Sequence, residues 1–157
     1  MKRPEKSFRF YIFTLLMVIS ASATMAADRY SVASGNWSST STWSATSGGS
    51  SGASAPVAGD IVYIEGNRTV TINVNAYCAS ISIENGSLLN IGAYTTNFTG
   101  TTTVSGTLTV TSTTGSKTFN QLVISGGTFR SNVAETYTIT ALTLEDGTIT
   151  GSNTGVF

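Results

Sequence analysis

The chain has 157 residues, 10% of them charged, with eight basic and eight acidic side chains, one cysteine and no histidine. The lack of histidine excludes catalytic triads and metal sites that depend on imidazole, and a single cysteine excludes an internal disulfide bond. After residue 26, four scattered basic and seven acidic side chains give a net charge of −3. We therefore expect no nucleic-acid partner, and no residue pattern indicates a bound cofactor.

The first 26 residues have the layout of a signal peptide. Four basic side chains lie between residues 2 and 9, and Phe10–Ser20 is an uncharged apolar run of 11 residues. A span of the bilayer core needs about 20 residues, so this run is too short, and the small residues before Ala27 fit a cleavage site. We predict removal of residues 1–26, a secreted or bacterial cell-surface protein, and no membrane span after cleavage; an uncleaved anchor is the alternative.

Residues 27–60 are expected to form an N-terminal cap that contains a Ser/Gly-rich loop. Residues 44–55 lack large apolar side chains and have little reason to pack, and a turn cluster then leads into a first strand at Ile61–Ile64. The tryptophans Trp37 and Trp43 allow two interpretations. They either cover the first coil of a repeat or form a sugar-stacking platform, which makes them candidate glycan-contact residues.

A repeat of about 20 residues occupies residues 61–157. Each copy has an aliphatic residue, a turn that ends in glycine, a small hydroxyl residue and a bulky apolar residue, as in Val104–Leu108 and Leu144–Ile149. A fixed period of this length is typical of a solenoid, and we expect the glycine to adopt a left-handed turn conformation. The repeated glycines, spaced by 20 or 21 residues, are Gly66, Gly86, Gly106, Gly127 and Gly147.

Four columns of side chains recur with this period and predict a shared core. The columns are Ile83, Val104, Ile124 and Leu144; Ile81, Thr102, Leu122 and Leu142; Leu88, Leu108, Phe129 and Ile149; and Cys78, Phe119 and Ile139 with Phe98 or Thr99. Stacked coils would pair their backbones in parallel ladders about 4.8 Å apart. The sequence thus predicts an all-β fold, a short parallel β-solenoid (right-handed β-helix). The alternative is a β-sandwich of antiparallel hairpins with Asn-Gly and Asp-Gly turns.

The pattern is still in mid-repeat at Val156 and Phe157. A solenoid interrupted at such a point exposes unpaired strand edges. We therefore expect a truncated solenoid, with neighbouring domains of a longer chain among its partners.

Roughly residues 33–92 resemble the G8 domain. The matching residues are Gly35–Trp37, Trp43, Pro56–Ile64, Gly66, Val70–Ile72, Ser80–Ile83 and Gly86–Leu88. The segment is also similar to the N-terminal part of long, repeat-rich β-helix surface proteins secreted by Bacteroidetes-type bacteria. The resemblance implies an extracellular all-β module that begins a β-helix. It also implies occurrence in adhesion-like and polysaccharide-related proteins, without an established activity of the module itself.

Few side chains are candidates for chemistry. Cys78 lacks a histidine as a base and falls in a core column, so we interpret it as a buried small hydrophobe. Asp60 is interpreted as a turn or capping acceptor rather than a calcium ligand. Glu65, Glu84 and Glu145 lie at turns; stacked on one edge they would bind a cation weakly, but we prefer exposure of each to solvent.

These observations favour a function without catalysis. We expect an extracellular structural or adhesive module that is not an enzyme, with a cell-surface or extracellular polysaccharide as a partner. The main alternative is the N-terminal part of a β-helix polysaccharide lyase or hydrolase whose catalytic coils lie further along the chain.

A minor alternative is ice binding, which requires a regular threonine ladder on a flat sheet. Threonine pairs occupy equivalent positions in two coils, but two other coils interrupt the ladder. The threonine pairs are Thr107/Thr109 and Thr148/Thr150, and the interrupting pairs are Ser87/Leu89 and Thr128/Arg130. We expect the serine and threonine side chains chiefly to keep a sheet soluble without charge.

Overall fold

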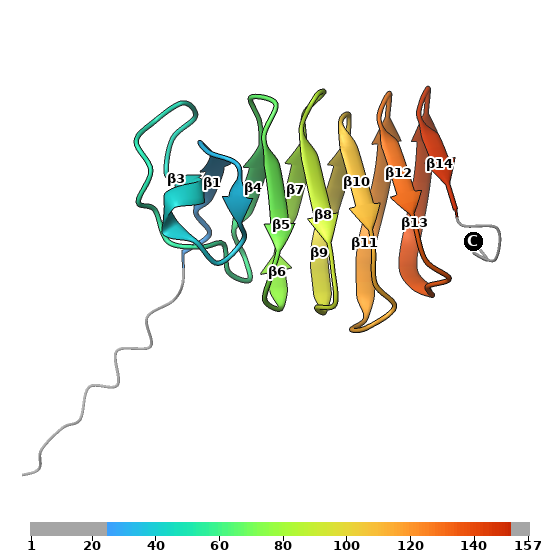
Figure 1. The fold of residues 1–157 in the computed structure, drawn as a ribbon. Helices are drawn as coiled ribbons and strands as arrows, with labels where there is room; N and C mark the ends of the chain where they lie inside the picture. The colour runs from blue at the N-terminus through green and yellow to red at the C-terminus, as the bar shows by residue number, and fades with distance from the viewer. Residues whose placement is uncertain (1–24, 152–157) are drawn as a thin grey trace, which may run out of the picture.

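The computed structural model describes residues 25–151 and folds them into two β-sheets wound as a solenoid (Figure 1). The coils are about 20 residues long and make about four turns. Every ladder between successive coils is parallel, which confirms the solenoid and excludes the β-sandwich. The predicted signal peptide, except its last two residues, and the final residues 152–157 lie outside the described part.

Each coil contributes one segment to each sheet. Sheet A contains, in spatial order, β13 (Tyr137–Glu145), β11 (Lys117–Ser125), β9 (Thr96–Val104), β7 (Ser80–Ile83), β4 (Ile61–Ile64), β1 (Asp28–Ser31) and β3 (Trp43–Ser44), with β6 (Ala76–Cys78) beside β9. Sheet B contains β14 (Thr148–Thr150), β12 (Thr128–Ser131), β10 (Thr107–Val110), β8 (Leu88–Ile91), β5 (Thr69–Ile72) and β2 (Gly35–Asn36). A single turn of 3₁₀ helix, η1 (Thr40–Thr42), lies between β2 and β3. Within residues 25–151 no helix is long and apolar enough to cross a membrane.

The strand register confirms three of the predicted core columns and corrects the one that was assigned Leu88. Phe98, not Thr99, pairs with both Cys78 and Phe119. In sheet B, Leu108 pairs with Leu89 and not with Leu88, so Leu89 is fully buried and Leu88 faces outward. The cause is the turn between β7 and β8, which is longer than the turn between β9 and β10. Alignment on the repeated glycine therefore misplaces the strand that follows by one residue.

The left-handed conformation predicted for the repeated glycine holds only in the first two turns. Gly66 and Gly86 have φ angles of 67° and 80°. In the later turns the glycine itself has no positive φ, and a different constraint acts. A Cβ atom at Gly127 would lie 2.5 Å from the carbonyl oxygen of Gly106. Glycine is required there because the backbones of adjacent turns approach too closely for a side chain.

Residues 27–60 form a more regular cap than the sequence indicates. β1 pairs in parallel with β4, and β2 pairs in parallel with β5, so the cap extends both sheets by one partial coil. The Ser/Gly-rich loop, expected to lack a reason to pack, is fastened by its backbone. The Gly52 amide donates to the carbonyl oxygens of Thr40 and Trp43, and Ala53 and Ala55 pack partly against the core. Backbone hydrogen bonds replace the missing apolar side chains.

Aromatic rings connect the cap to the coils through the core. Trp37 lies edge-on to Trp43 and stacks on Phe98, with centroid distances of 5.3 and 6.2 Å. Phe98 contacts Phe119 edge-to-face at 5.7 Å, and Phe119 contacts Phe129 at 6.3 Å. Such pairs add about 0.5–1.5 kcal/mol each beyond the burial of their area. The row ties one coil to the next at the centre of the molecule.

The opposite end of the described stack is uncovered. Leu142 and Leu144 are 49% and 54% exposed, whereas Leu122 and Ile124, at the same positions one coil earlier, are fully buried. β13 is therefore an edge strand whose inward side chains lack a neighbouring coil among residues 25–151.

We expect Phe119→Ala to lower the free energy of unfolding by about 3–5 kcal/mol, since it removes a fully buried ring that contacts Phe98 of the preceding coil and Phe129 of its own coil. Val123→Ala, on the outward face of the same strand, should cost less than about 1 kcal/mol. Urea unfolding followed by far-UV circular dichroism measures both values. Equal effects of the two substitutions would contradict the assigned inward and outward faces.

Candidate functional site

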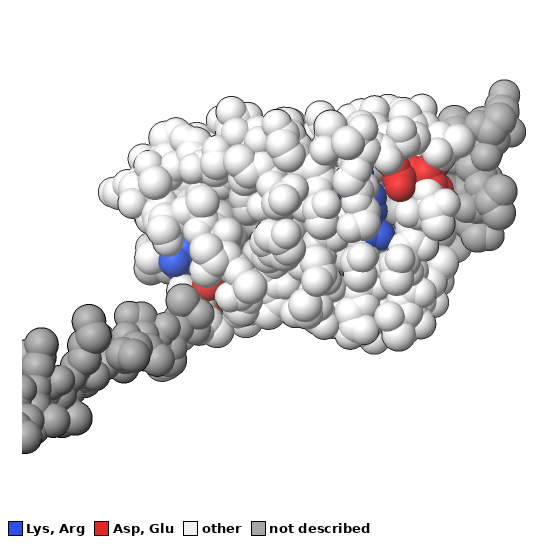
Figure 2. All heavy atoms as spheres, turned by 90° about the horizontal axis from the view of Figure 1, so that it is seen from below, with Lys and Arg blue, Asp and Glu red and all other residues white. Residues whose placement is uncertain are grey.

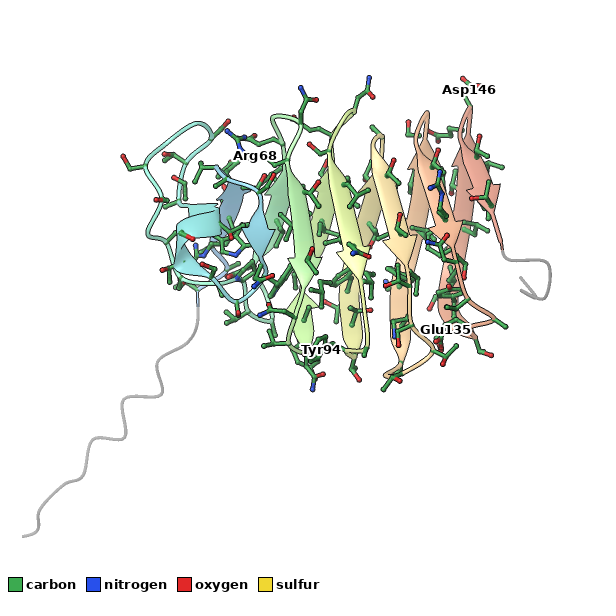
Figure 3. All side chains as sticks on the ribbon, in the orientation of Figure 1. Arg68, Tyr94, Glu135 and Asp146 are labelled. Carbon is green, nitrogen blue, oxygen red and sulfur yellow. The ribbon has the colours of Figure 1, made fainter. Side chains whose placement is uncertain are left out.

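Charged side chains lie mainly at the turns and in the cap, and the sheet faces are nearly free of them. Arg68 and Asp146 mark the upper turns and Glu135 a lower turn (Figure 3). The view from below shows the side of the stack formed by the lower turns, where the few charged atoms lie toward the two ends (Figure 2). The described strands of sheet B contain one charged residue, Arg130. A ligand that approaches a sheet face therefore meets hydroxyl, amide and apolar groups.

The outward face of sheet A carries a continuous field of uncharged side chains. Its positions in β4, β7, β9, β11 and β13 are Ile61 and Tyr63, Ser80 and Ser82, Thr101 and Thr103, Gln121 and Val123, and Ala141 and Thr143. We call this set the sheet A face. Thr101 donates a hydrogen bond to the side-chain oxygen of Gln121 at 2.6 Å, which links neighbouring coils on the surface. Parallel pairing spaces the rows by about 4.8 Å.

A stacked tyrosine pair lies at the cap end of the sheet A face. Tyr30 of β1 is directly beside Tyr63 of β4, with ring centroids 4.6 Å apart and planes at 8°. Both rings are partly exposed. Partial burial and the Asp28 carboxylate raise the pKa of the Tyr30 phenol, so this hydroxyl remains protonated at neutral pH. The pair offers aromatic edges and the Tyr63 hydroxyl beside the serine and threonine rows, while the Tyr30 hydroxyl donates to the Asp28 carboxylate.

The two candidate glycan-contact residues predicted from sequence lie inside the cap. Trp37 is 1% exposed and Trp43 is fully buried. The Trp43 indole nitrogen donates to the carbonyl oxygen of Trp37 at 2.7 Å, which satisfies its polar atom without a ligand. Both rings therefore do what the capping interpretation expects. Stacking of a sugar on either ring would require the cap to open.

Asp60 has the role of turn acceptor predicted for it. Its carboxylate accepts hydrogen bonds from the backbone amides of Ala27 and Val57, each at 3.0 Å, and lies 3.8 Å from the Arg29 guanidinium. The carboxylate is almost fully buried. It thereby joins the turn before β4 to the start of β1 and holds the cap on the first coil.

The other predicted candidates are not brought together. Cys78 is buried. Burial raises the pKa of its thiol, and the nearby Asp60 carboxylate raises it further by a smaller amount. Glu65 accepts hydrogen bonds from the Ser47 hydroxyl and the Gly48 amide, and Glu84 accepts one from the amide of Gly66. In the strand register, Glu145 lies beside Ser125 and not beside another acidic residue. Among the described residues, no three acidic or thiol side chains are close enough together to hold a metal ion.

Sequence reasoning missed one basic residue in the core. Lys117 begins β11 at an inward position and is 1% exposed. Its amine donates to the carbonyl oxygens of Thr114 and Gly115, each at 2.6 Å. Desolvation lowers the pKa of Lys117, and the nearby Glu135 carboxylate acts in the opposite direction. The side chain closes the preceding turn from inside. In the ladder Lys117 follows Ala76 and Thr96, a column that was not predicted from the sequence.

The threonine ladder lies on sheet B, in a register different from the predicted one. One outward column contains threonine in every coil except that of Leu88, and the second column contains Asn90 and Arg130. The interruption predicted at Ser87/Leu89 therefore occurs at Leu88/Asn90. The interruption at Thr128/Arg130 stays where it was predicted, because Arg130 is outward and exposed.

Comparison with known proteins gives no match. No protein-family model matches the chain, and neither a curated protein nor a solved structure matches it.

We expect Asp60→Ala to lower the free energy of unfolding by about 2–3 kcal/mol, since two backbone amides at a buried site lose their acceptor. Asp60→Asn retains an acceptor oxygen and should cost less. The measurement is urea unfolding, with limited proteolysis to detect release of the cap. Resistance of the Asp60→Ala cap to protease, with unchanged stability, would show that β1 is held by other contacts.

We expect native Cys78 to react with a thiol reagent at least about 100-fold more slowly than the unfolded chain, because reaction requires local opening and a thiolate. The control is a Cys78→Ala, Thr113→Cys variant, whose new thiol lies in an exposed turn. Absorbance of the released reagent group gives both rates at pH 8. Fast labelling of native Cys78 would place this side chain at the surface and contradict the fourth column.

Proposed function

We propose that the protein is a secreted or cell-surface structural and adhesive module, without catalysis of its own, that binds glycans on the sheet A face. The signal-peptide pattern of residues 1–26 supports export. The resemblance of roughly residues 33–92 to the G8 domain of bacterial surface proteins supports the same setting. Both are arguments from the sequence.

The observation that carries the glycan proposal is the composition of the sheet A face. Sugars present many hydroxyl groups and apolar ring faces, and proteins bind them with hydrogen-bonding side chains next to aromatic rings. The face supplies Ser80, Ser82, Thr101 and Thr103 in adjacent rows, and the Tyr30–Tyr63 pair lies at its end. The tyrosine pair thus takes the place first assigned to the two tryptophans.

Rigidity and regular spacing favour an extended polymer as the ligand. The rows belong to one parallel sheet, and their side chains repeat at intervals of about 4.8 Å along the solenoid axis. Uncharged hydroxyl groups cost less to desolvate than charged groups do. A neutral polysaccharide laid along the axis can therefore contact several coils, with small contributions adding along its length.

The test is binding of the secreted form of the chain to a panel of neutral oligosaccharides, followed by substitution of the tyrosine. Tyr63→Ala should weaken binding by at least about 10-fold, since it removes a ring and a hydroxyl from the face. Tyr63→Phe keeps the ring stack and should lose less. Thr71→Ala, outward on sheet B, is the matched control and should bind like the parent chain.

Two results would overturn the proposal. One is a panel on which the chain binds no neutral oligosaccharide, and the other is unchanged binding by Tyr63→Ala. Thermal unfolding of each variant shows whether a loss of binding is caused by a loss of folding. Tyr63→Phe should keep the melting temperature of the parent.

A further inference from the structure

Arg130 is a departure from the repeat on an otherwise uncharged sheet. It is the one charged residue in the described strands of sheet B. The residues at the same outward position in the other coils are Asn36, Thr71, Asn90, Thr109 and Thr150. Since uncharged residues satisfy the fold at this position in every other coil, the fold does not require arginine there. A local departure of this kind indicates function.

Arg130 also differs from the other basic residues in its contacts. Within residues 25–151, each other base donates hydrogen bonds to the protein: Arg29 to Ser54, Arg68 to Glu65, and Lys117 to Thr114 and Gly115. Arg130 is exposed and has no hydrogen-bond or ion-pair partner among these residues. Its guanidinium group therefore retains all its donors for a ligand.

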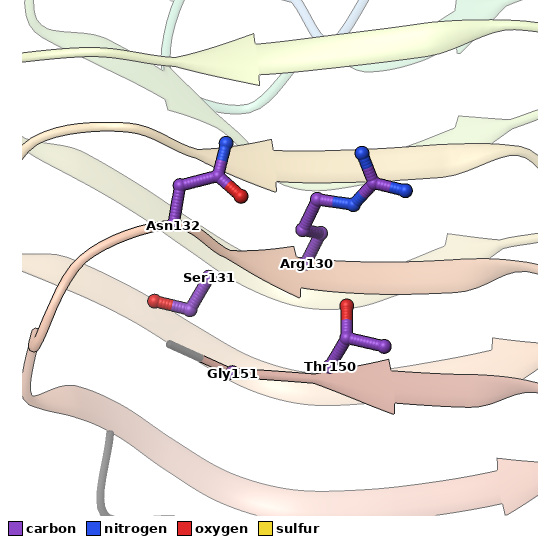
Figure 4. Close-up of a pocket in the computed structure, with 5 residues that line it drawn as sticks. All are labelled: Arg130, Ser131, Asn132, Thr150 and Gly151. Carbon is purple, nitrogen blue, oxygen red and sulfur yellow. The ribbon is translucent and has the colours of Figure 1, made fainter. Parts of the chain in front are cut away.

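The surface around Arg130 forms a shallow pocket that supplies further donors (Figure 4). Arg130 and Asn132 lie two residues apart and project to the same side of the chain, and Thr150 is directly beside Arg130 in the ladder. Ser131 faces the other way. Its hydroxyl donates to the carbonyl oxygen of Val133 at 2.6 Å and accepts from Tyr137. These bonds fix the end of β12, from which Arg130 and Asn132 project.

The pocket has the chemistry of an oxyanion site. A guanidinium group binds a carboxylate or sulfate with two parallel hydrogen bonds, and the Asn132 amide and the Thr150 hydroxyl lie on the same side as added donors. No acidic side chain lines the pocket to compete for the arginine. Binding of a highly charged polymer requires several basic side chains. A single arginine on a face of hydroxyl groups is better suited to one acid group on a sugar.

We propose that Arg130, Asn132 and Thr150 form a second binding site, which takes the carboxylate or sulfate group of an acidic saccharide. The site lies on sheet B and is separate from the sheet A face. Its preference for an oxyanion follows from the residues of the pocket. The inference that a saccharide carries this oxyanion rests on the proposed function. The experiment must therefore distinguish binding at the two faces.

The experiment measures calorimetric binding of four probes to the secreted form of the chain: an oligogalacturonate, a sulfated oligosaccharide, a neutral oligosaccharide and inorganic sulfate. We expect tighter binding of an acidic saccharide than of its neutral counterpart, and weaker binding as salt increases. Arg130→Gln should reduce acidic binding by at least about 10-fold and leave neutral binding on the sheet A face unchanged. The oligogalacturonate and the sulfated probe show which acid group is preferred.

Two control variants sharpen the result. Arg130→Lys keeps the charge but not the two-pronged geometry, and it should retain only part of the affinity. Arg68→Gln removes an arginine at a turn of the same solenoid and should bind like the parent chain.

Unchanged acidic binding by Arg130→Gln would overturn the proposal, and so would binding of inorganic sulfate without any acidic saccharide. Acidic binding that depends on Arg130 but is accompanied by no neutral binding would support this site and count against the sheet A face. The two proposals can therefore fail independently.

Discussion

Sharing of one core between successive coils is the constraint on which this molecule depends. A single coil buries only a few apolar side chains, too few to offset the conformational entropy of some 20 ordered residues. Stacking supplies what each coil lacks, since Phe119 contacts Phe98 of the preceding coil and Phe129 of its own coil. The same stacking pairs every strand with its neighbour. Inward residues must therefore repeat from coil to coil, and the backbone at Gly106 and Gly127 must remain free of side chains.

The choice of residue at outward positions is much less constrained than at inward positions. Outward positions have only to be soluble and compatible with a strand, which threonine and serine satisfy without charge. The two faces use that freedom differently. Sheet A places a tyrosine pair beside hydroxyl rows, while sheet B has threonine at most outward positions, interrupted by Leu88, Asn90 and Arg130. A scaffold with strict inward and permissive outward positions can gain a binding group without loss of its core.

The sequence alone was sufficient to predict the parallel sheets, because inward residues recur at a nearly fixed period. It failed where the period breaks. Turns of unequal length moved Leu89 into the place assigned to Leu88, and an extra residue in β9 left the choice between Phe98 and Thr99 open. The cap lies outside the repeat, so no periodic signal marked the pairing of Tyr30 with Tyr63 or the burial of Trp37. Lys117 and Arg130 each differ from the residues at equivalent positions in the other coils. Such a difference is visible only once the coils are aligned in the correct register.

The irregular residue count of β9 bears on how a molecule of this kind changes in length. An inserted residue normally turns every following side chain of a strand to the opposite face, and the shift between Phe119 and Gln121 shows one such residue absorbed at a bulge. Most single insertions lack such a bulge and would disrupt the columns. Duplication of a whole coil preserves them and adds about 4.8 Å along the axis. Evolution can therefore change the length of this solenoid only by whole coils, so its possible lengths differ by multiples of about 4.8 Å.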